Sequence, residues 1–141
     1  MAHWGSITDE RDAVVSGKTT AVEQVQKALK LVDDAQEYNA TLALASHALD
    51  QAKAVDARIK AGEDVGPLAG VPFIAKDNFL TIDTETTASS NILKGFSPPF
   101  NATAIDKLEA AGAILVAKAN LDSFAHGAST ENSDFGPTNQ D

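Results

Sequence analysis

The sequence holds 141 residues, enough for one domain with an ordinary hydrophobic core, and its 43% hydrophobic and 22% charged residues are typical of a globular protein. A net charge of −9 without a basic stripe argues against a protein that grips nucleic acid by itself. With no cysteine, the chain can form no disulfide bond, thiol nucleophile or thiolate metal site. No segment has the length and apolarity of a membrane span, and the start of the chain shows no secretory pattern, so we expect a cytoplasmic protein without membrane contact.

The first half of the chain, residues 1–65, is predicted to be a helical leader with one short strand. Its first two helices each begin with a capping box, in which a Ser or Thr hydroxyl and an acidic side chain three residues later satisfy backbone N–H groups. Apolar residues then recur at helical spacing and give the second helix a face that can pack against a core. The predicted elements are helices at 6–15, capped by Ser6 and Asp9, and at 20–35, capped by Thr20 and Glu23, a strand at 41–45, and a helix at 46–60 capped by Ser46.

The stretch G-P-L-A-G-V-P-F-I-A-K-D-N at 66–78 carries the first candidate for chemistry. Five apolar or small residues, bounded by Gly and Pro, predict a buried strand that leads into Lys76. Because side chains alternate along a strand, Lys76 should share a face with Ile74 and Asn78, opposite Asp77. Burial would lower the pKa of Lys76, and a lysine that is neutral at neutral pH can act as a general base. The alternative is a lysine that only extends from a strand end to water.

The rest of the second half, residues 66–141, is predicted to complete a strand–helix–strand unit and to end in a polar loop. Two strands joined by a helix in this order favour a parallel, right-handed α/β arrangement. Small, hydroxyl, amide and acidic side chains dominate the last loop, which indicates either hydrogen bonding to a polar ligand or a solvated turn. The elements are a long loop after Asn78 with a short helix at 89–93, a helix capped by Asn101 and ended by Gly112, a strand at 113–117 leading into Lys118, and the polar loop at 127–136.

Three stretches together resemble the amidase signature family and, within it, the A subunits of glutamyl-tRNA(Gln) amidotransferases. They are P-L-A-G-V-P-F-I-A-K-D-N at 67–78, F-S-P-P-F-N-A-T-A-I-D-K-L-E-A-A-G-A-I-L-V-A-K-A-N-L-D at 96–122, and G-A-S-T-E-N-S-D-F-G-P-T-N at 127–139. The resemblance covers essentially the whole chain and implies the N-terminal part of the amidase signature fold. In that α/β fold, a helical leader precedes the first strands of a mixed sheet with covering helices.

The resemblance also implies a catalytic triad of a serine, a bridging cis-serine and a lysine, in which Lys76 matches the family's lysine. The lysine accepts a proton from the bridging serine, which activates the nucleophilic serine. No metal takes part. We expect the polar loop to contact the substrate, and the residues assigned to that task are Ser129, Thr130, Glu131 and Asn132.

The sequence departs from the family pattern at three points. The family's serines lie in and after a G-G-S-S-G-G loop downstream of G-P-T, and this chain stops at Asp141 without it, so we expect these residues to be inactive alone. His126 stands where an apolar residue is more usual, and Ser89 where glycine is common. We interpret His126 as a tolerated substitution near the substrate cavity.

The implied activity is hydrolysis of glutamine, whose ammonia converts Glu-tRNA(Gln) to Gln-tRNA(Gln). B and C subunits would complete a heterotrimer, bind the charged tRNA and use ATP and magnesium, so that this chain itself needs no cofactor. The asparagine-directed variant of the reaction stays open. Two other hypotheses also remain: a stand-alone amidase of the same family, and a non-catalytic folding or assembly module whose exposed sheet edge would lead to self-association.

Overall fold

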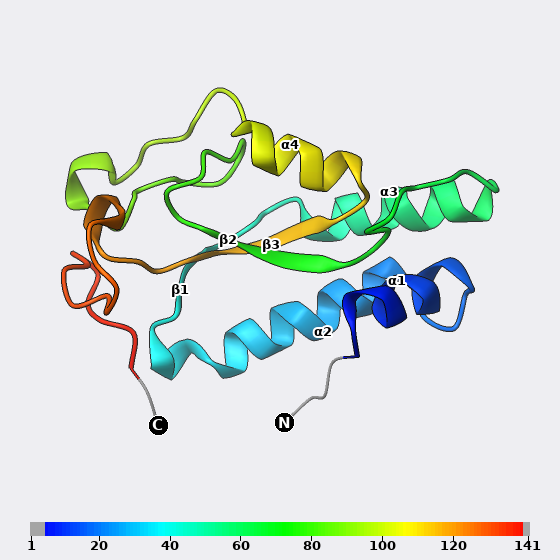
Figure 1. Ribbon diagram of the computed structural model, residues 1–141, viewed down its shortest axis with the longest axis horizontal. Helices are drawn as coiled ribbons and strands as arrows, with labels where there is room; N and C mark the ends of the chain where they lie inside the picture. Colours follow the sequence, from blue (N-terminus) through cyan, green and yellow to red (C-terminus); the bar gives the residue numbers. More distant parts are fainter. Residues whose placement is uncertain (1–4, 140–141) are drawn as a thin grey trace.

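A three-stranded sheet lies between helices on both of its faces in the computed structural model, which describes residues 5–139 (Figure 1). None of the helices within these residues is long and apolar enough to cross a membrane. The elements are α1 (Ile7–Val15), α2 (Ala21–Asp34), β1 (Thr41–Leu44), α3 (Ala48–Lys60), β2 (Pro72–Lys76), α4 (Thr103–Ala110) and β3 (Ile114–Ala119), with 3₁₀ turns at Gln36–Tyr38, Asn91–Leu93 and Ser123–Ala125.

Both capping boxes of the leader are confirmed. The Asp9 N–H donates to Ser6 Oγ over 3.1 Å, and the Asp9 carboxylate accepts from the Ser6 N–H over 3.1 Å. The same reciprocal pair joins Thr20 and Glu23 over 3.1 and 3.0 Å at the start of α2. Hydrogen bonds from Ser6 lower the pKa of Asp9, and hydrogen bonds from the Thr19 hydroxyl and then the Thr20 N–H lower the pKa of Glu23. These helices therefore begin where their local sequence dictates.

The two other predicted caps are wrong. α3 begins at Ala48 without a side-chain cap, and the hydroxyl of Ser46 instead donates to the Asp83 carbonyl over 3.3 Å. α4 begins at Thr103 without a side-chain cap as well, and Asn101 Oδ1 accepts from the Ile82 N–H over 2.7 Å. Each side chain bonds a backbone group of the loop after β2 instead of the first N–H groups of its helix. It thereby ties that loop to the start of the helix.

The strand order is β1-β3-β2, with β2 parallel to β3 and β1 antiparallel to it, which confirms the expected mixed sheet. β3 pairs with both other strands and is therefore central, and its first five residues are all buried. The register between the parallel strands slips once: Phe73 pairs with Leu115, and the next pair is Ile74 with Ala117. Val116 is therefore an extra residue in β3, and a bulge of this kind reverses the facing of every side chain that follows.

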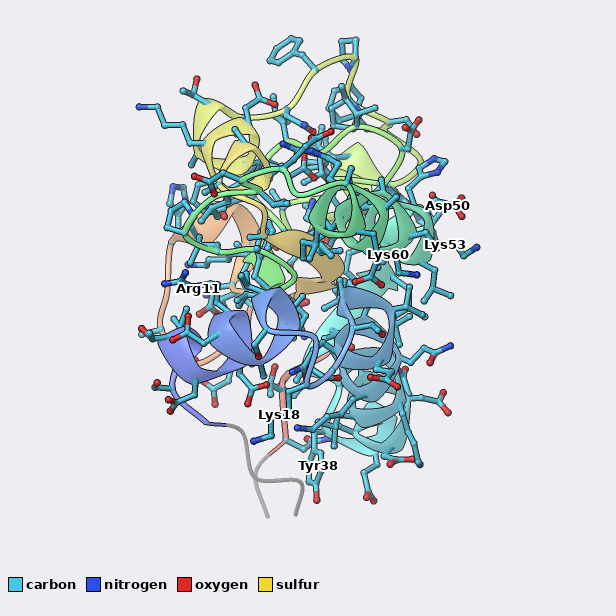
Figure 2. The ribbon with its side chains drawn as sticks, turned by 90° about the vertical axis from the view of Figure 1, so that its right-hand side faces the viewer. Arg11, Lys18, Tyr38, Asp50, Lys53 and Lys60 are labelled. Atoms are coloured by element: carbon cyan, nitrogen blue, oxygen red, sulfur yellow. The ribbon has the colours of Figure 1, made fainter. Side chains whose placement is uncertain are left out.

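Two apolar clusters cover the two faces of the sheet. The larger joins α1, α2 and α3 to β3 and consists mainly of alanine and valine, with Ile114 and Val116 from the strand. The smaller joins α4 to the other face through Ile105, Leu115 and Ala75. Figure 2 shows this layering end-on, with α1 and α2 on one side of the sheet and α4 on the other.

An apolar groove of about 440 Å³ opens between α1, α2 and β2. Its lining includes Ile74 of β2, which is 47% exposed, and Leu31 and Val32 of α2. Within the described residues β2 is an edge strand that pairs only with β3, so its other edge has no strand partner there. The face of β2 that carries Ile74 also carries Lys76, which decides how that lysine is placed.

Candidate active site

Lys76 is the last residue of β2, and its side chain is exposed. The predicted alternation is confirmed, because Ile74 and Asn78 are exposed with it while Ala75 and Asp77 are buried. The predicted burial of Lys76 is wrong: the residue is exposed, on the same face of β2 as the exposed Ile74. The argument that desolvation neutralises this lysine therefore does not hold for the described residues, and its catalytic role stays a prediction.

The lysine that lies buried among the described residues is Lys118, near the end of β3, which is 0% exposed. Its ammonium group forms an ion pair with Asp77, with 3.0 Å between Nζ and Oδ1. It also donates to the Phe79 carbonyl over 2.9 Å and to the hydroxyls of Thr81 and Thr86 over 3.0 and 2.9 Å. Burial lowers the pKa of Lys118, and the neighbouring Asp77 carboxylate opposes that shift. Lys118 is thus enclosed by the first turns of the loop after β2.

Asp77 fixes the same loop with its second carboxylate oxygen. Oδ2 accepts from the Thr87 N–H over 2.9 Å and from the Thr87 hydroxyl through a short hydrogen bond. The backbone of Asp77 donates to the Ala119 carbonyl over 3.0 Å and accepts from the Ala88 N–H over 2.9 Å. The residue after Lys76 therefore clamps the end of β2 both to β3 and to the returning loop.

Ser89 connects this loop to the segment after β3. It is fully buried and adopts a left-handed conformation with φ of 54°, which explains why glycine suits this position. Its hydroxyl donates to Asn120 Oδ1 and accepts from the Leu121 N–H, both over 3.1 Å. Its carbonyl accepts from the Ser123 hydroxyl over 2.8 Å and from the Asp134 N–H over 3.0 Å. The serine thus contributes a polar link that glycine lacks.

Asp122, which lies three residues beyond β3, organises the polar loop. Its Oδ2 accepts from the N–H groups of Ser129 and Thr130, both over 2.9 Å, and its Oδ1 accepts from the Asn132 N–H over 3.1 Å. The pKa of the Asp122 carboxyl is lowered, first by the hydrogen bonds from Thr130 and Asn132, and also by the one from Ser129 and by the charge of Lys76. The Asp122 carboxylate is thus held by the N–H groups of the polar loop and also experiences the positive charge of the predicted base.

The four residues predicted to contact the substrate lie together in one tight turn. The Ser129 hydroxyl donates to the Glu131 carboxylate over 3.0 Å. Thr130 uses its hydroxyl within the loop, where it donates to the Ser129 carbonyl and accepts from the Thr138 N–H, both over 2.6 Å. Ser129, Glu131 and Asn132 are exposed, so their carboxylate, hydroxyl and amide groups are accessible to a polar molecule. Their role in binding stays a prediction.

His126 is exposed and follows the 3₁₀ turn Ser123–Ala125. The sequence alone assigned no role to Lys118, Asp77 or Asp122. The motifs that end the two parallel strands could have indicated them. The strands β2 and β3 end in K-D-N and K-A-N-L-D, and the carboxyl ends of neighbouring parallel strands meet at one end of the sheet. Figure 1 shows both following loops at that end.

Comparison with known proteins shows which family this chain is similar to. The sequence pattern of the family described as Amidase matches residues 21–140. The A subunit of glutamyl-tRNA(Gln) amidotransferase from Thermobifida fusca is 50% identical over 128 residues, which are 89% of this chain and 26% of that protein. The protein of the same name from Deinococcus radiodurans is 48% identical over 138 residues, 98% of this chain and 28% of its own length.

A solved structure from a vestigial protein complex, described as revealing the evolutionary origins of an s-triazine catabolic enzyme, has the same fold with a TM-score of 0.89. It is 33% identical and covers 95% of this chain and 30% of its own. The chain thus spans about a quarter of the length of the curated relatives it matches.

Proposed function

The chain belongs to the Amidase family, and on that basis we propose that it is part of the glutamine-hydrolysing subunit of a tRNA-dependent amidotransferase. The structural observation that supports the proposal is the Asp122 carboxylate, which accepts hydrogen bonds from the N–H groups of Ser129, Thr130 and Asn132 and whose pKa is lowered by these bonds and by the charge of Lys76. The two relatives named as amidotransferase A subunits, at 50% and 48% identity, support it, and the second is matched over 98% of the chain and so across both regions.

In the proposed mechanism Lys76 is the base of a relay with two serines. A neutral lysine accepts a proton from a bridging serine, which in turn deprotonates the serine that attacks the side-chain amide of glutamine. Ammonia leaves, an acyl-enzyme forms, and water releases glutamate. The sequence of 141 residues contains no G-G-S-S-G-G run, so we expect that these residues by themselves release no ammonia.

For Lys76 to act as a neutral base, it must lie in a drier environment than its exposed position at the end of β2. In the proposal, the segment that carries the serines covers the exposed face of β2 and removes water from the lysine, which favours its uncharged form. The exposed hydroxyl, carboxylate and amide groups of the 129–132 turn then hydrogen-bond the polar ends of glutamine.

The ammonia produced would convert Glu-tRNA(Gln) to Gln-tRNA(Gln). We propose that B and C subunits complete a heterotrimer, hold the charged tRNA and activate its glutamate with ATP and magnesium. A net charge of −9 supports a division of labour in which this chain contributes to making ammonia and does not itself grip RNA.

The test is glutamine-dependent ammonia release by the full-length protein, with Lys76→Met beside a matched lysine variant. Lys53→Met is the control, because Lys53 lies on the outer surface of α3, 3.3 Å from Asp50 (Figure 2). We expect Lys76→Met to lower turnover by at least about a hundredfold and Lys53→Met to leave it unchanged. Near-normal turnover in Lys76→Met would remove the lysine from the mechanism. Hydrolysis of simple aliphatic or aryl amides in preference to glutamine would favour the stand-alone amidase.

A further inference from the structure

We propose that Asp122 is a positioning residue that holds the loop of residues 127–133 in the shape needed to contact substrate beside Lys76. The expected effect on glutamine binding rests on the proposed function. The anchoring of the loop rests only on the contacts of the Asp122 carboxylate. Asp122 is 3% exposed and is placed just beyond β3 by the buried Leu121.

Three converging N–H groups show that the loop is built around an anion. Those of Ser129, Thr130 and Asn132 all point at the Asp122 carboxylate, two on one oxygen and one on the other. Thr130 has a left-handed φ of 63°, which turns successive N–H groups toward one side of the backbone. A concave array of backbone N–H groups of this kind binds negative charge, and here an internal side chain supplies it.

Gly127 closes the other side of the carboxylate. A Cβ atom built at this position would lie 2.6 Å from both Cγ and Oδ2 of Asp122, so that the backbone of residue 127 lies directly on the carboxylate. The φ of Gly127 is not in the left-handed region, so the glycine is needed for space and not for its conformational freedom. The carboxylate is thereby enclosed between the start of the loop and its turn.

This arrangement divides the loop into two parts with different tasks. The backbone N–H groups of the turn donate to the Asp122 carboxylate, while the side chains of Ser129, Glu131 and Asn132 are exposed to solvent. The charge of Lys76 also lowers the pKa of the Asp122 carboxyl. Asp122 therefore sets where the substrate-side groups stand relative to the proposed base without itself contacting substrate.

The experiment compares Asp122→Asn and Gly127→Ala with Asp134→Asn in the full-length protein. In Asp122→Asn the amide nitrogen must face one of the three N–H donors, so at least one hydrogen bond is lost together with the charge. Gly127→Ala disturbs the same carboxylate by a single methyl group. Asp134→Asn changes charge equally, but its exposed carboxylate bonds the Asn91 N–H over 2.7 Å and not the turn.

We expect both test variants to raise the KM for glutamine by about tenfold or more with a much smaller change in kcat, because the loop is misplaced and the catalytic groups are retained. Hydrogen exchange should speed up at the amides of residues 129, 130 and 132 in both variants and stay slow in Asp134→Asn. Exchange can be measured even if the protein does not hydrolyse glutamine, so failure of the proposed function remains distinguishable. Unchanged exchange at these amides in both test variants would overturn the inference, as would equal losses of kcat in all three.

Discussion

Replacing Lys118 by methionine is the most direct test of how the end of the sheet is held together. Methionine keeps most of the volume of the lysine stem and removes its ammonium group. That group pairs with Asp77 at 3.0 Å and donates to one carbonyl and two hydroxyls at 2.9–3.0 Å. The substitution therefore leaves the Asp77 carboxylate, which is 1% exposed, without its counter-charge.

The expected cost follows from that orphaned charge. Removing one partner of a buried ion pair costs about 3–5 kcal/mol, because the other partner keeps its desolvation penalty without compensation. Against a total stability of roughly 5–15 kcal/mol for a globular domain, this is a large fraction. We accordingly expect Lys118→Met to lower the free energy of unfolding by about 3–5 kcal/mol.

The assay is urea denaturation followed by circular dichroism, with a double-mutant cycle to isolate the pair. Asp77→Asn combined with Lys118→Met removes both charges, while the amide oxygen can still accept from the Thr87 N–H. We expect the double variant to lose less unfolding free energy than the two single variants lose in sum, by at least about 1 kcal/mol. Strict additivity, or a loss below about 1 kcal/mol in Lys118→Met, would refute the view that the pair holds this end of the sheet.

Two further predictions concern a glycine and a carboxylate. At Gly112 an added Cβ would lie 2.7 Å from the Val65 carbonyl oxygen and 2.8 Å from Ala69 Cα, whereas at Gly62 it would meet nothing within 4 Å, although both residues have left-handed φ values. Gly112→Ala should therefore cost about 1–3 kcal/mol more than Gly62→Ala in urea denaturation, and equal losses would contradict the packing argument. Because the folded pKa of Asp122 lies below its unfolded value, its carboxylate contributes stability above about pH 4 and loses it as pH falls through the folded pKa. The stability difference between wild type and Asp122→Asn should shrink below about pH 4, and a difference that stays constant down to about pH 2 would contradict this assignment.

Elements governed by nearby residues were predictable from the sequence. The capping boxes at Ser6 and Thr20 and the strand leading to Lys76 all depend on contacts within a few residues. Ser46 and Asn101 have the composition of caps, yet their side chains bond the loop after β2, more than 15 residues away in sequence. Local preference was overridden there because the loop after β2 brings the Asp83 carbonyl and the Ile82 N–H to these side chains, which bond them in place of the first N–H groups of the helices.

The four residues Ser129–Asn132 were predictable as a polar cluster, but the carboxylate that shapes them was not. Asp122 lies seven to ten residues earlier, in a segment whose composition resembles the end of any strand. Its function depends on the chain turning back at Gly127 to bring three N–H groups to one point. No periodicity in the sequence encodes such a convergence.

The different placement of the two strand-end lysines depends on one extra residue. Simple alternation from Leu115, which faces α4, would direct Lys118 to the opposite face. The bulge at Val116 instead pairs Lys118 with Ala75, on the face that also carries Asp77. The buried carboxylate next to the proposed base is thereby neutralised by Lys118, while Lys76 on the other face remains free of that partner. Lys118 is committed to this buried ion pair, so the exposed Lys76 is the strand-end lysine that our proposal assigns to proton transfer.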